Sequence, residues 1–173
     1  MTYLIIDLGL AAIVLFSRFF LYQLVIVKGR SMLSTLENRQ VLWVSMLTYH
    51  LRKPRRQDVV ICHYPGRRMK NLPFLKENFV KRIVGVPGDI VEMLAGVLYV
   101  NGEPLDEPYL DPLHTRSRMT RAAVMLGADE YFVMGDNRDN SNDSRRIGPI
   151  RRDMIVGRVQ RILYPFRKAR RIH

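Results

Sequence analysis

The chain has 173 residues, enough for one domain of ordinary size and a short additional segment. Hydrophobic residues make up 47% and charged residues 25%, which excludes a disordered chain, and the net charge of +12 favours an anionic partner. No zinc-finger, RNA-binding or P-loop motif accompanies the basic residues, so we expect no nucleic-acid partner and consider a membrane surface instead.

The N-terminal segment, residues 3–27, is almost entirely apolar. A helix from Tyr3 to Tyr22 would be about 30 Å long, which matches the hydrocarbon core of a bilayer. Arg18 is the costly residue in such a span unless it reaches toward the interface. A cleaved signal peptide is disfavoured, because neither a basic start nor a small-residue cleavage site is present. A buried soluble helix is the remaining alternative.

These features predict a membrane anchor over residues 1–27 and a domain over residues 28–173 that ends in a basic C-terminal tail. Lys28 and Arg30 follow the span and nothing basic precedes it, so the positive-inside rule places the domain in the cytoplasm. Large domains can cross a membrane despite their charge, which leaves the orientation open on this criterion.

After the anchor, short apolar runs alternate with turns, a pattern typical of β-structure. Asn101-Gly102 is a two-residue hairpin signal, and a helical turn is possible over residues 31–36. The domain is therefore expected to be mostly β. The predicted strands are 24–27, 41–44, 59–61, 79–86, 90–93, 97–100, 131–134 and 154–163.

Cys62 is the single cysteine, so no disulfide can form within the chain. It is adjacent to His63 on a predicted strand, where neighbouring side chains point to opposite faces. We therefore interpret Cys62 as a small buried hydrophobe and not as a nucleophile.

Three stretches combine residues that carry chemistry: residues 29–36, 81–89 and 135–148. Taken alone, Ser31 is a common kind of turn or capping residue. Lys81 is more informative, since it alternates with Phe79 and Ile83 and so shares a face with apolar groups. Burial there would lower the pKa of its amine, and only a neutral amine can accept a proton from a serine.

The third stretch is rich in Asp, Asn and Ser, a composition that suits a loop or an acidic metal site. Its carboxylates are interleaved with Arg138 and Arg145, which favours ion pairs over a bound cation. We therefore expect neither a metal nor a cofactor.

Taken together, the stretches resemble the bacterial type I signal peptidase family in its compact Gram-positive form. The matching motifs are Gly-x-Ser-Met-x-x-Thr-Leu, Lys-Arg-x-x-Gly-x-Pro-Gly-Asp and Gly-Asp-Asn-Arg-x-x-Ser-x-Asp-Ser-Arg, in the family's order behind an anchor. The resemblance runs from the anchor to about Gly157. It implies a signal-peptidase-like catalytic domain, a β-barrel or sheet, with one N-terminal transmembrane helix.

The resemblance also implies roles for single residues. Ser31 would be the nucleophile and donate its backbone N–H to the oxyanion, with Lys81 as the general base. Ser141 would hydrogen-bond the Lys81 amine. The supporting salt bridge would join Asp143 to Arg145, and Arg82 would lie beside it.

Three positions depart from the family's pattern. Ser34 stands where the family usually has Pro, which predicts a looser turn behind the nucleophile. Gly29 occupies a position where some members have a Ser that completes the oxyanion hole, although Gly is common in the compact subgroup. Arg30 is bulky where smaller or acidic residues are common.

The leading hypothesis is a serine endopeptidase that removes signal peptides from exported preproteins, held in the cell membrane by one span with its catalytic domain outside the cytoplasm. Its expected partners are those signal peptides and anionic membrane lipids. The alternative is a non-catalytic accessory protein in surface-protein or pilus assembly, but such relatives typically lose the Ser or the Lys. A self-cleaving Ser–Lys repressor would need a DNA-binding domain where the anchor lies.

Overall fold

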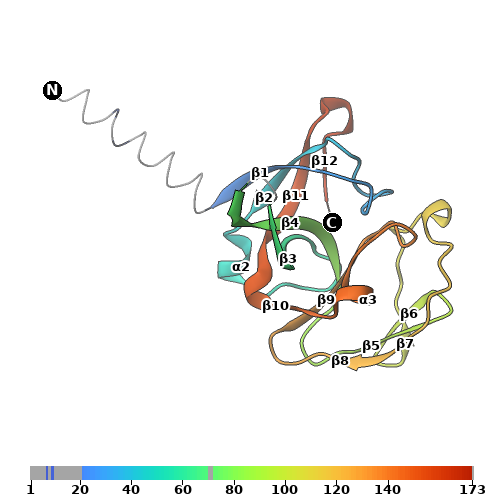
Figure 1. Ribbon diagram of the computed structural model, residues 1–173. Coiled ribbons are helices and arrows are strands. Elements are labelled where there is room, and N and C mark those ends of the chain that lie inside the picture. The colour runs from blue at the N-terminus through green and yellow to red at the C-terminus, as the bar shows by residue number, and fades with distance from the viewer. Residues whose placement is uncertain (1–6, 8, 10–20, 70–71, 173) are drawn as a thin grey trace.

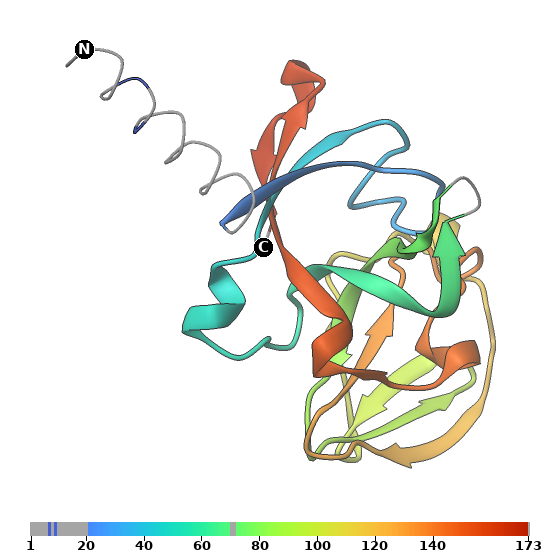
Figure 2. The ribbon, with the colours of Figure 1, turned by 60° about the vertical axis from the view of Figure 1, so that its left-hand side comes forward.

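The computed structural model describes residues 7, 9, 21–69 and 72–172 of the chain. Within this part, antiparallel strands form two sheets, so the predicted mostly-β class is confirmed (Figure 1; Figure 2). The larger sheet has the order β1-β2-β11-β3-β4-β9-β10, with β12 paired to β11, and the smaller has the order β7-β6-β5-β8.

The strands are β1 (Tyr22–Ile26), β2 (Val41–Ser45), β3 (Val59–Met69), β4 (Leu72–Gly85), β5 (Ile90–Leu94), β6 (Val97–Val100), β7 (Glu103–Pro104), β8 (Arg121–Met125), β9 (Glu130–Met134), β10 (Ile150–Arg151), β11 (Ile155–Tyr164) and β12 (Arg170–Arg171). The short helices are α2 (Thr48–Leu51), α3 (Ser144–Ile147) and the 3-10 turns η1 (Pro112–His114), η2 (Arg152–Met154) and η3 (Phe166–Lys168).

Every strand predicted from the apolar runs coincides with a strand of the structure. The hairpin signal is confirmed as well: Asn101 and Gly102 have φ angles of 55° and 84°, and β6 pairs with β7 on either side of them. The four-residue helices α2 and α3 were not predicted, because a single turn is too short to show a 3.6-residue period.

The predicted anchor lies mostly outside the described residues. No helix among the residues that the structure describes is both long and apolar enough to span a membrane. The last part of the 1–27 segment belongs to the sheet, since β1 pairs with β2 from Tyr22↔Ser45 to Ile26↔Val41.

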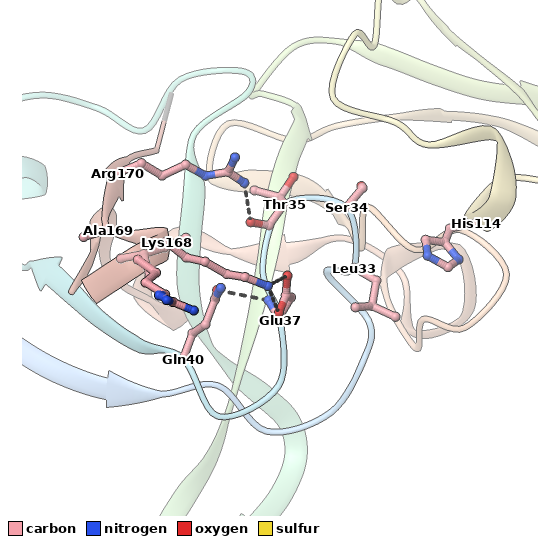
Figure 3. Close-up of a pocket in the computed structure, with 11 residues that line it drawn as sticks. Leu33, Ser34, Thr35, Glu37, Gln40, His114, Lys168, Ala169 and Arg170 are labelled. Atoms are coloured by element: carbon pink, nitrogen blue, oxygen red, sulfur yellow. Dashed lines mark hydrogen bonds and ion pairs between the residues drawn. The ribbon is translucent and has the colours of Figure 1, made fainter. Parts of the chain in front are cut away.

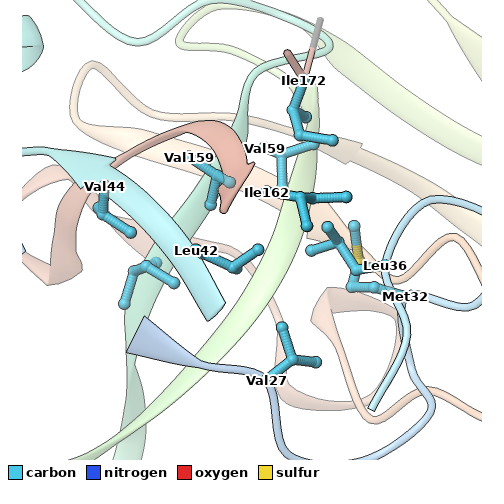
Figure 4. Close-up of a cluster of buried hydrophobic side chains, with 10 residues drawn as sticks. Val27, Met32, Leu36, Leu42, Val44, Val59, Val159, Ile162 and Ile172 are labelled. Atoms are coloured by element: carbon cyan, nitrogen blue, oxygen red, sulfur yellow. The ribbon is translucent and has the colours of Figure 1, made fainter. Parts of the chain in front are cut away.

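Among the described residues, the core consists of three apolar clusters that position the functional loops. One cluster lies among β2, β3 and β11 and includes Met32 and Leu36, which anchor the stretch that follows Ser31 (Figure 4). Another joins the two sheets, with Phe132 of β9 among its buried residues. There, a Cβ on Gly85 would lie 2.6 Å from a Val91 methyl, so this glycine permits the close approach of the two sheets.

The C-terminal segment is part of the fold and not a free tail. Strand β12 pairs with β11, and Ile172 is 6% exposed within the cluster that holds Met32. Arg167 and Arg171 are exposed, so the segment presents positive charge to solvent while its apolar residue is buried.

Candidate active site

Ser31 lies at the start of a compact turn. Gly29, with φ +98°, precedes it in a backbone conformation that favours glycine, and its N–H donates to Asn38 Oδ1 at 3.0 Å. The Leu36 N–H donates to Met32 O at 2.7 Å, and both side chains are buried. The serine is therefore fixed on a turn that the core holds from behind.

Lys81 reaches this turn from β4. Its Nζ lies 2.7 Å from Ser31 Oγ and also donates to Val80 O at 3.0 Å. The residue is 3% exposed, as its alternation with apolar neighbours predicted, and the Phe79 ring centroid is 5.2 Å from Nζ. Burial lowers the pKa of Lys81 to about 8.

The lowered pKa increases the fraction of Lys81 that is neutral at pH 7. At the ordinary pKa of about 10.4, about one lysine in 2,500 is neutral at pH 7, whereas at about 8 the fraction is roughly one in ten. The arrangement of Lys81 and Ser31 can thus transfer a proton from a hydroxyl to an amine at neutral pH.

Arg82, the next residue on β4, forms a buried ion pair with Asp136. Its Nε and Nη2 donate to the two carboxylate oxygens at 3.0 and 2.8 Å, and its Nη1 donates to Gln57 O. Thr35 Oγ1 donates to Asp136 as well, which ties the serine turn to this pair. The guanidinium carbon lies 3.8 Å from the Tyr109 ring centroid. The partnership with Asp136 was not predicted, although Asp136 stands in the third motif.

The predicted salt bridge between Asp143 and Arg145 is formed. Arg145 Nε and Nη2 donate to the carboxylate at 2.8 and 2.9 Å, and the Gly135 N–H donates to it at 2.9 Å. Burial alone would raise the pKa of Asp143, but these donors hold it below its ordinary value. Arg138, interleaved with them, pairs with Glu107, so the expectation of ion pairs in this stretch is met.

The predicted hydrogen bond from Ser141 to the Lys81 amine is not formed in the structure, which corrects that assignment. Ser141 Oγ is buried without a hydrogen-bond partner and lies near the Asp143 carboxylate, outside hydrogen-bond geometry. Ser141 packs against Gly135, where an added Cβ would lie 2.3 Å from both Ser141 Oγ and Ser31 O, and Lys81 Nζ contacts Ser31 Oγ and Val80 O instead. Gly135 thus leaves room for two close neighbours, a role that was not predicted.

The departures from the family's pattern are accommodated locally. Ser34 has a φ of 83°, which proline cannot adopt, and its Oγ donates to Tyr109 O at 3.0 Å. The Ser34 side chain therefore links the turn to the loop that carries Tyr109. Arg30 is exposed, so its bulk meets no neighbour in the core, and its backbone O accepts from Asn137 Nδ2 at 3.0 Å.

Two remaining features complete the surroundings. Cys62 is 0% exposed, and burial raises the pKa of its thiol, in agreement with the prediction of an inert hydrophobe. Among the residues with described placement, no three His, Cys, Asp or Glu side chains lie close enough to hold a metal ion.

A cavity of about 590 Å³ lies between the serine turn and the C-terminal segment (Figure 3). Lys168 crosses it to bind Glu37 at 2.5 and 2.7 Å, and Arg170 Nη2 donates to Thr35 O at 3.1 Å. His114 and Leu33 line the opposite end. The C-terminal segment therefore contacts the backbone of the turn that carries Ser31.

Comparison with known proteins agrees with the motifs. Residues 1–164 match the family "Signal peptidase, peptidase S26". The chain is 35% identical over 162 residues to signal peptidase I of Bacillus caldolyticus, covering 87% of this chain and 84% of that protein. It is 35% identical over 163 residues to signal peptidase I S of Bacillus subtilis, covering 89% and 83%.

A third relative, signal peptidase I of Leptolyngbya laminosa, is 36% identical over 133 residues, and the match covers 77% of this chain and 64% of that protein. A crystal structure of a signal peptidase I from Enterococcus faecalis superposes with a TM-score of 0.47 at 28% identity, covering 62% of this chain and 97% of that one. By the extent of the family match and the identity to the two Bacillus proteins, this chain belongs to the bacterial type I signal peptidases, peptidase family S26.

Proposed function

We propose that this protein is a membrane-bound serine endopeptidase that removes N-terminal signal peptides from exported preproteins through a dyad of Ser31 and Lys81. The observation that carries the proposal is the 2.7 Å separation between Ser31 Oγ and the Nζ of a lysine that is 3% exposed. The substrate class follows from kinship, since the relatives are named signal peptidase I.

The reaction begins with neutral Lys81. Ser31 Oγ attacks the carbonyl carbon of the scissile peptide bond, and its proton passes to Lys81 Nζ. The carbonyl oxygen becomes an oxyanion, for which the Ser31 N–H is the available donor on the turn. When the carbon–nitrogen bond breaks, the Lys81 ammonium gives its proton to the leaving amine, and the signal peptide stays bound to Ser31 as an ester.

The second half repeats the same proton transfers with water. Neutral Lys81 takes a proton from a water molecule, the resulting hydroxide attacks the ester carbon, and a second oxyanion forms. As the ester bond breaks, Ser31 Oγ recovers the proton from Lys81. The products are a signal peptide with a free carboxyl group and a mature protein with a new amino terminus.

The two members of the Asp143–Arg145 salt bridge act on the pKa of Lys81 in opposite directions. Burial lowers the pKa of Lys81, the Asp143 carboxylate opposes that shift, and the Arg145 guanidinium adds to it. Because Arg145 neutralises Asp143 at 2.8 Å, the carboxylate can fix the loop without returning Lys81 to its charged form.

The membrane location is proposed on two grounds, the family and the apolar N-terminal segment. Leu24 and Ile26 of β1, near the end of that segment, are 54% and 60% exposed and add apolar surface there. We place the catalytic domain outside the cytoplasm, where translocated preproteins are cut. Protease added to intact spheroplasts should digest the domain, whereas digestion only after lysis would contradict this orientation.

Activity is tested by incubating the purified protein with a preprotein and mapping the cut by mass spectrometry. Ser31→Ala, Lys81→Ala and the double variant should each lose at least about a thousandfold in rate, because the two residues act as one unit. Lys81→Arg should also be inactive, since a guanidinium stays protonated. Substantial turnover by any of these folded variants would defeat the assignment.

A further inference from the structure

Asn137 contacts both peptide units that flank Ser31. Its backbone N–H donates to Ser31 O at 3.1 Å, and its side-chain Nδ2 donates to Arg30 O at 3.0 Å. The residue is 5% exposed, and it lies 107 positions from Arg30 in the sequence. One buried residue of the third motif therefore fixes the backbone on each side of the serine.

The orientation of the Asn137 amide is determined by a third contact. The Asn140 N–H donates to Asn137 Oδ1 at 3.1 Å. A reversed amide would place NH₂ against this N–H and an oxygen against Arg30 O, two repulsive contacts in place of two hydrogen bonds. The group that meets Arg30 O is therefore the amide nitrogen.

The contact with Arg30 O has a consequence for the other side of the same peptide unit. The Arg30–Ser31 bond is trans, and in a trans peptide the C=O and the following N–H point in opposite directions. Arg30 O also accepts from the Leu33 N–H at 3.2 Å inside the turn, and Asn137 Nδ2 is the donor that reaches it from the third motif. The donor that holds Arg30 O toward Asn137 turns the Ser31 N–H away from Asn137. In the described part of the chain, that N–H donates to no acceptor.

We propose that Asn137 is a positioning residue for peptide hydrolysis, which sets the direction of the Ser31 N–H toward the developing oxyanion. It does so without touching the substrate, by holding the Arg30–Ser31 peptide through its side chain and the next peptide through its backbone. With both peptides fixed, the Ser31 Cα–Cβ bond is fixed as well, so nucleophile and oxyanion donor keep one mutual geometry. This inference rests on the proposed function.

The test uses the full-length protein in detergent with a peptide spanning a signal-peptide cleavage site. Asn137→Ala removes the whole side chain, and Asn137→Asp is nearly isosteric but places an oxygen where the donor to Arg30 O stood. Asn140→Ala is the matched control, because its exposed side chain makes no hydrogen bond to any described residue. Melting temperatures of all variants are measured alongside kcat and KM.

Loss of one oxyanion donor lowers kcat about 100- to 1,000-fold, and a misdirected donor should lose part of this. We expect kcat to fall about 10- to 100-fold in both Asn137 variants, with KM within about twofold of the wild type. The midpoint of the pH–rate profile should stay unchanged in Asn137→Ala, since the contact between Lys81 and Ser31 is retained. Asn140→Ala should match the wild type.

Three results would overturn the proposal. The first is a kcat within about twofold of the wild type in a folded Asn137 variant. The others are a loss of kcat/KM that is explained entirely by a rise in KM, or one that is explained entirely by a displaced midpoint of the pH–rate profile. Ser31→Ala in the same assay separates this inference from the proposed function. If Ser31→Ala is inactive and the Asn137 variants are fully active, only the positioning role fails. If Ser31→Ala still cleaves, the dyad itself fails.

Discussion

Arg82 and Asp136 form a bidentate ion pair, in which two guanidinium nitrogens donate to the two carboxylate oxygens at 3.0 and 2.8 Å. Both are buried, at 2% and 0% exposure, and Thr35 from the serine turn donates to the same carboxylate. The pair therefore connects β4, which carries Lys81, to the turn that carries Ser31.

Asp136→Asn should lower the free energy of unfolding by about 3–5 kcal/mol, because it removes the negative partner of a buried guanidinium. Denaturant unfolding with and without the substitution measures this. Asp153→Asn is the matched control: Asp153 pairs with Arg151 at 3.4 Å with both side chains 70% exposed, so its change should stay below about 1 kcal/mol. Equal effects at the two sites would contradict the role given to the buried pair.

The rate of peptide cleavage should rise with pH through about 8 and then level off, because in the proposed dyad only neutral Lys81 accepts the serine proton, and burial lowers its pKa to about 8. Below that value the rate should fall about tenfold per pH unit. A pH–rate profile of kcat/KM checks this. A profile that is flat from pH 6 to 9 would show that Lys81 is not the base.

The same pKa shift predicts a pH-dependent stability. The unfolded chain keeps the ordinary lysine pKa of 10.5 and binds more protons than the folded one between about 8 and 10.5, so Lys81 contributes stability that rises with pH across that window. At a pH below about 8, the buried lysine should lower the free energy of unfolding by on the order of 3 kcal/mol relative to a pH above 10.5. The free energies of unfolding of the wild type and of Lys81→Met should therefore converge or cross as pH rises. A difference between them that does not change with pH would contradict burial of the amine.

Ser34→Pro should reduce both stability and activity, although the family usually has Pro at this position. The backbone φ of 83° is closed to proline, whose ring fixes φ near −65°, so the turn would have to rearrange around Ser31. Ser34→Gly keeps the backbone conformation and serves as the control. A proline variant as active and as stable as the glycine variant would mean that the turn adopts a second conformation at no cost.

Gly135→Ala should abolish most activity in a protein that still folds. The added Cβ would lie 2.3 Å from Ser31 O and from Ser141 Oγ, so the serine backbone must shift. Gly127→Ala is the comparison, because its Cβ would meet only the end of the Glu130 side chain, at 3.3 Å. Cleavage rates and melting temperatures of both variants test this prediction. A Gly135→Ala variant that cleaves at the wild-type rate would show that displacement of the Ser31 backbone does not reduce activity.

Binding to anionic lipid should depend on the charges of the C-terminal segment, but a truncation cannot test this, since it would also remove buried Ile172. Arg167→Gln with Arg171→Gln is the better change, because both side chains are exposed and form no hydrogen bond to the described residues. A form that begins at Tyr22 keeps β1 and should bind anionic vesicles but not neutral ones. Each substitution should weaken that binding by up to about 1 kcal/mol.

The control for this experiment is the melting temperature, which should not change in the double variant. Added salt should release the wild type from the vesicles, because surface attraction is screened within a Debye length. Equal vesicle binding by wild type and double variant would exclude these two arginines as a lipid contact.

The sequence was sufficient to predict the strands and the apolar environment of Lys81, because both follow from the alternation of side chains along a strand. Lys81 shares a face with Phe79 and Ile83 wherever that strand lies in the fold. It was not sufficient for the partners of charged and polar groups. Arg82 could have paired with several carboxylates of the third motif, and only the packing of the turn against β4 selects Asp136. The contacts of Asn137 and Gly135 with the serine backbone have no local signal at all.

The separation of these parts along the chain bears on when the protein becomes a protease. Ser31 meets Lys81 across 50 positions, Arg30 meets Asn137 across 107, and Thr35 meets Arg170 across 135. A chain emerging from the ribosome thus contains Ser31 long before it contains the residues that hold the serine turn in place. We expect hydrolysis to begin only after the last strand has been synthesised, because Asn137 and Arg170, which hold the backbone of the serine turn, come late in the chain.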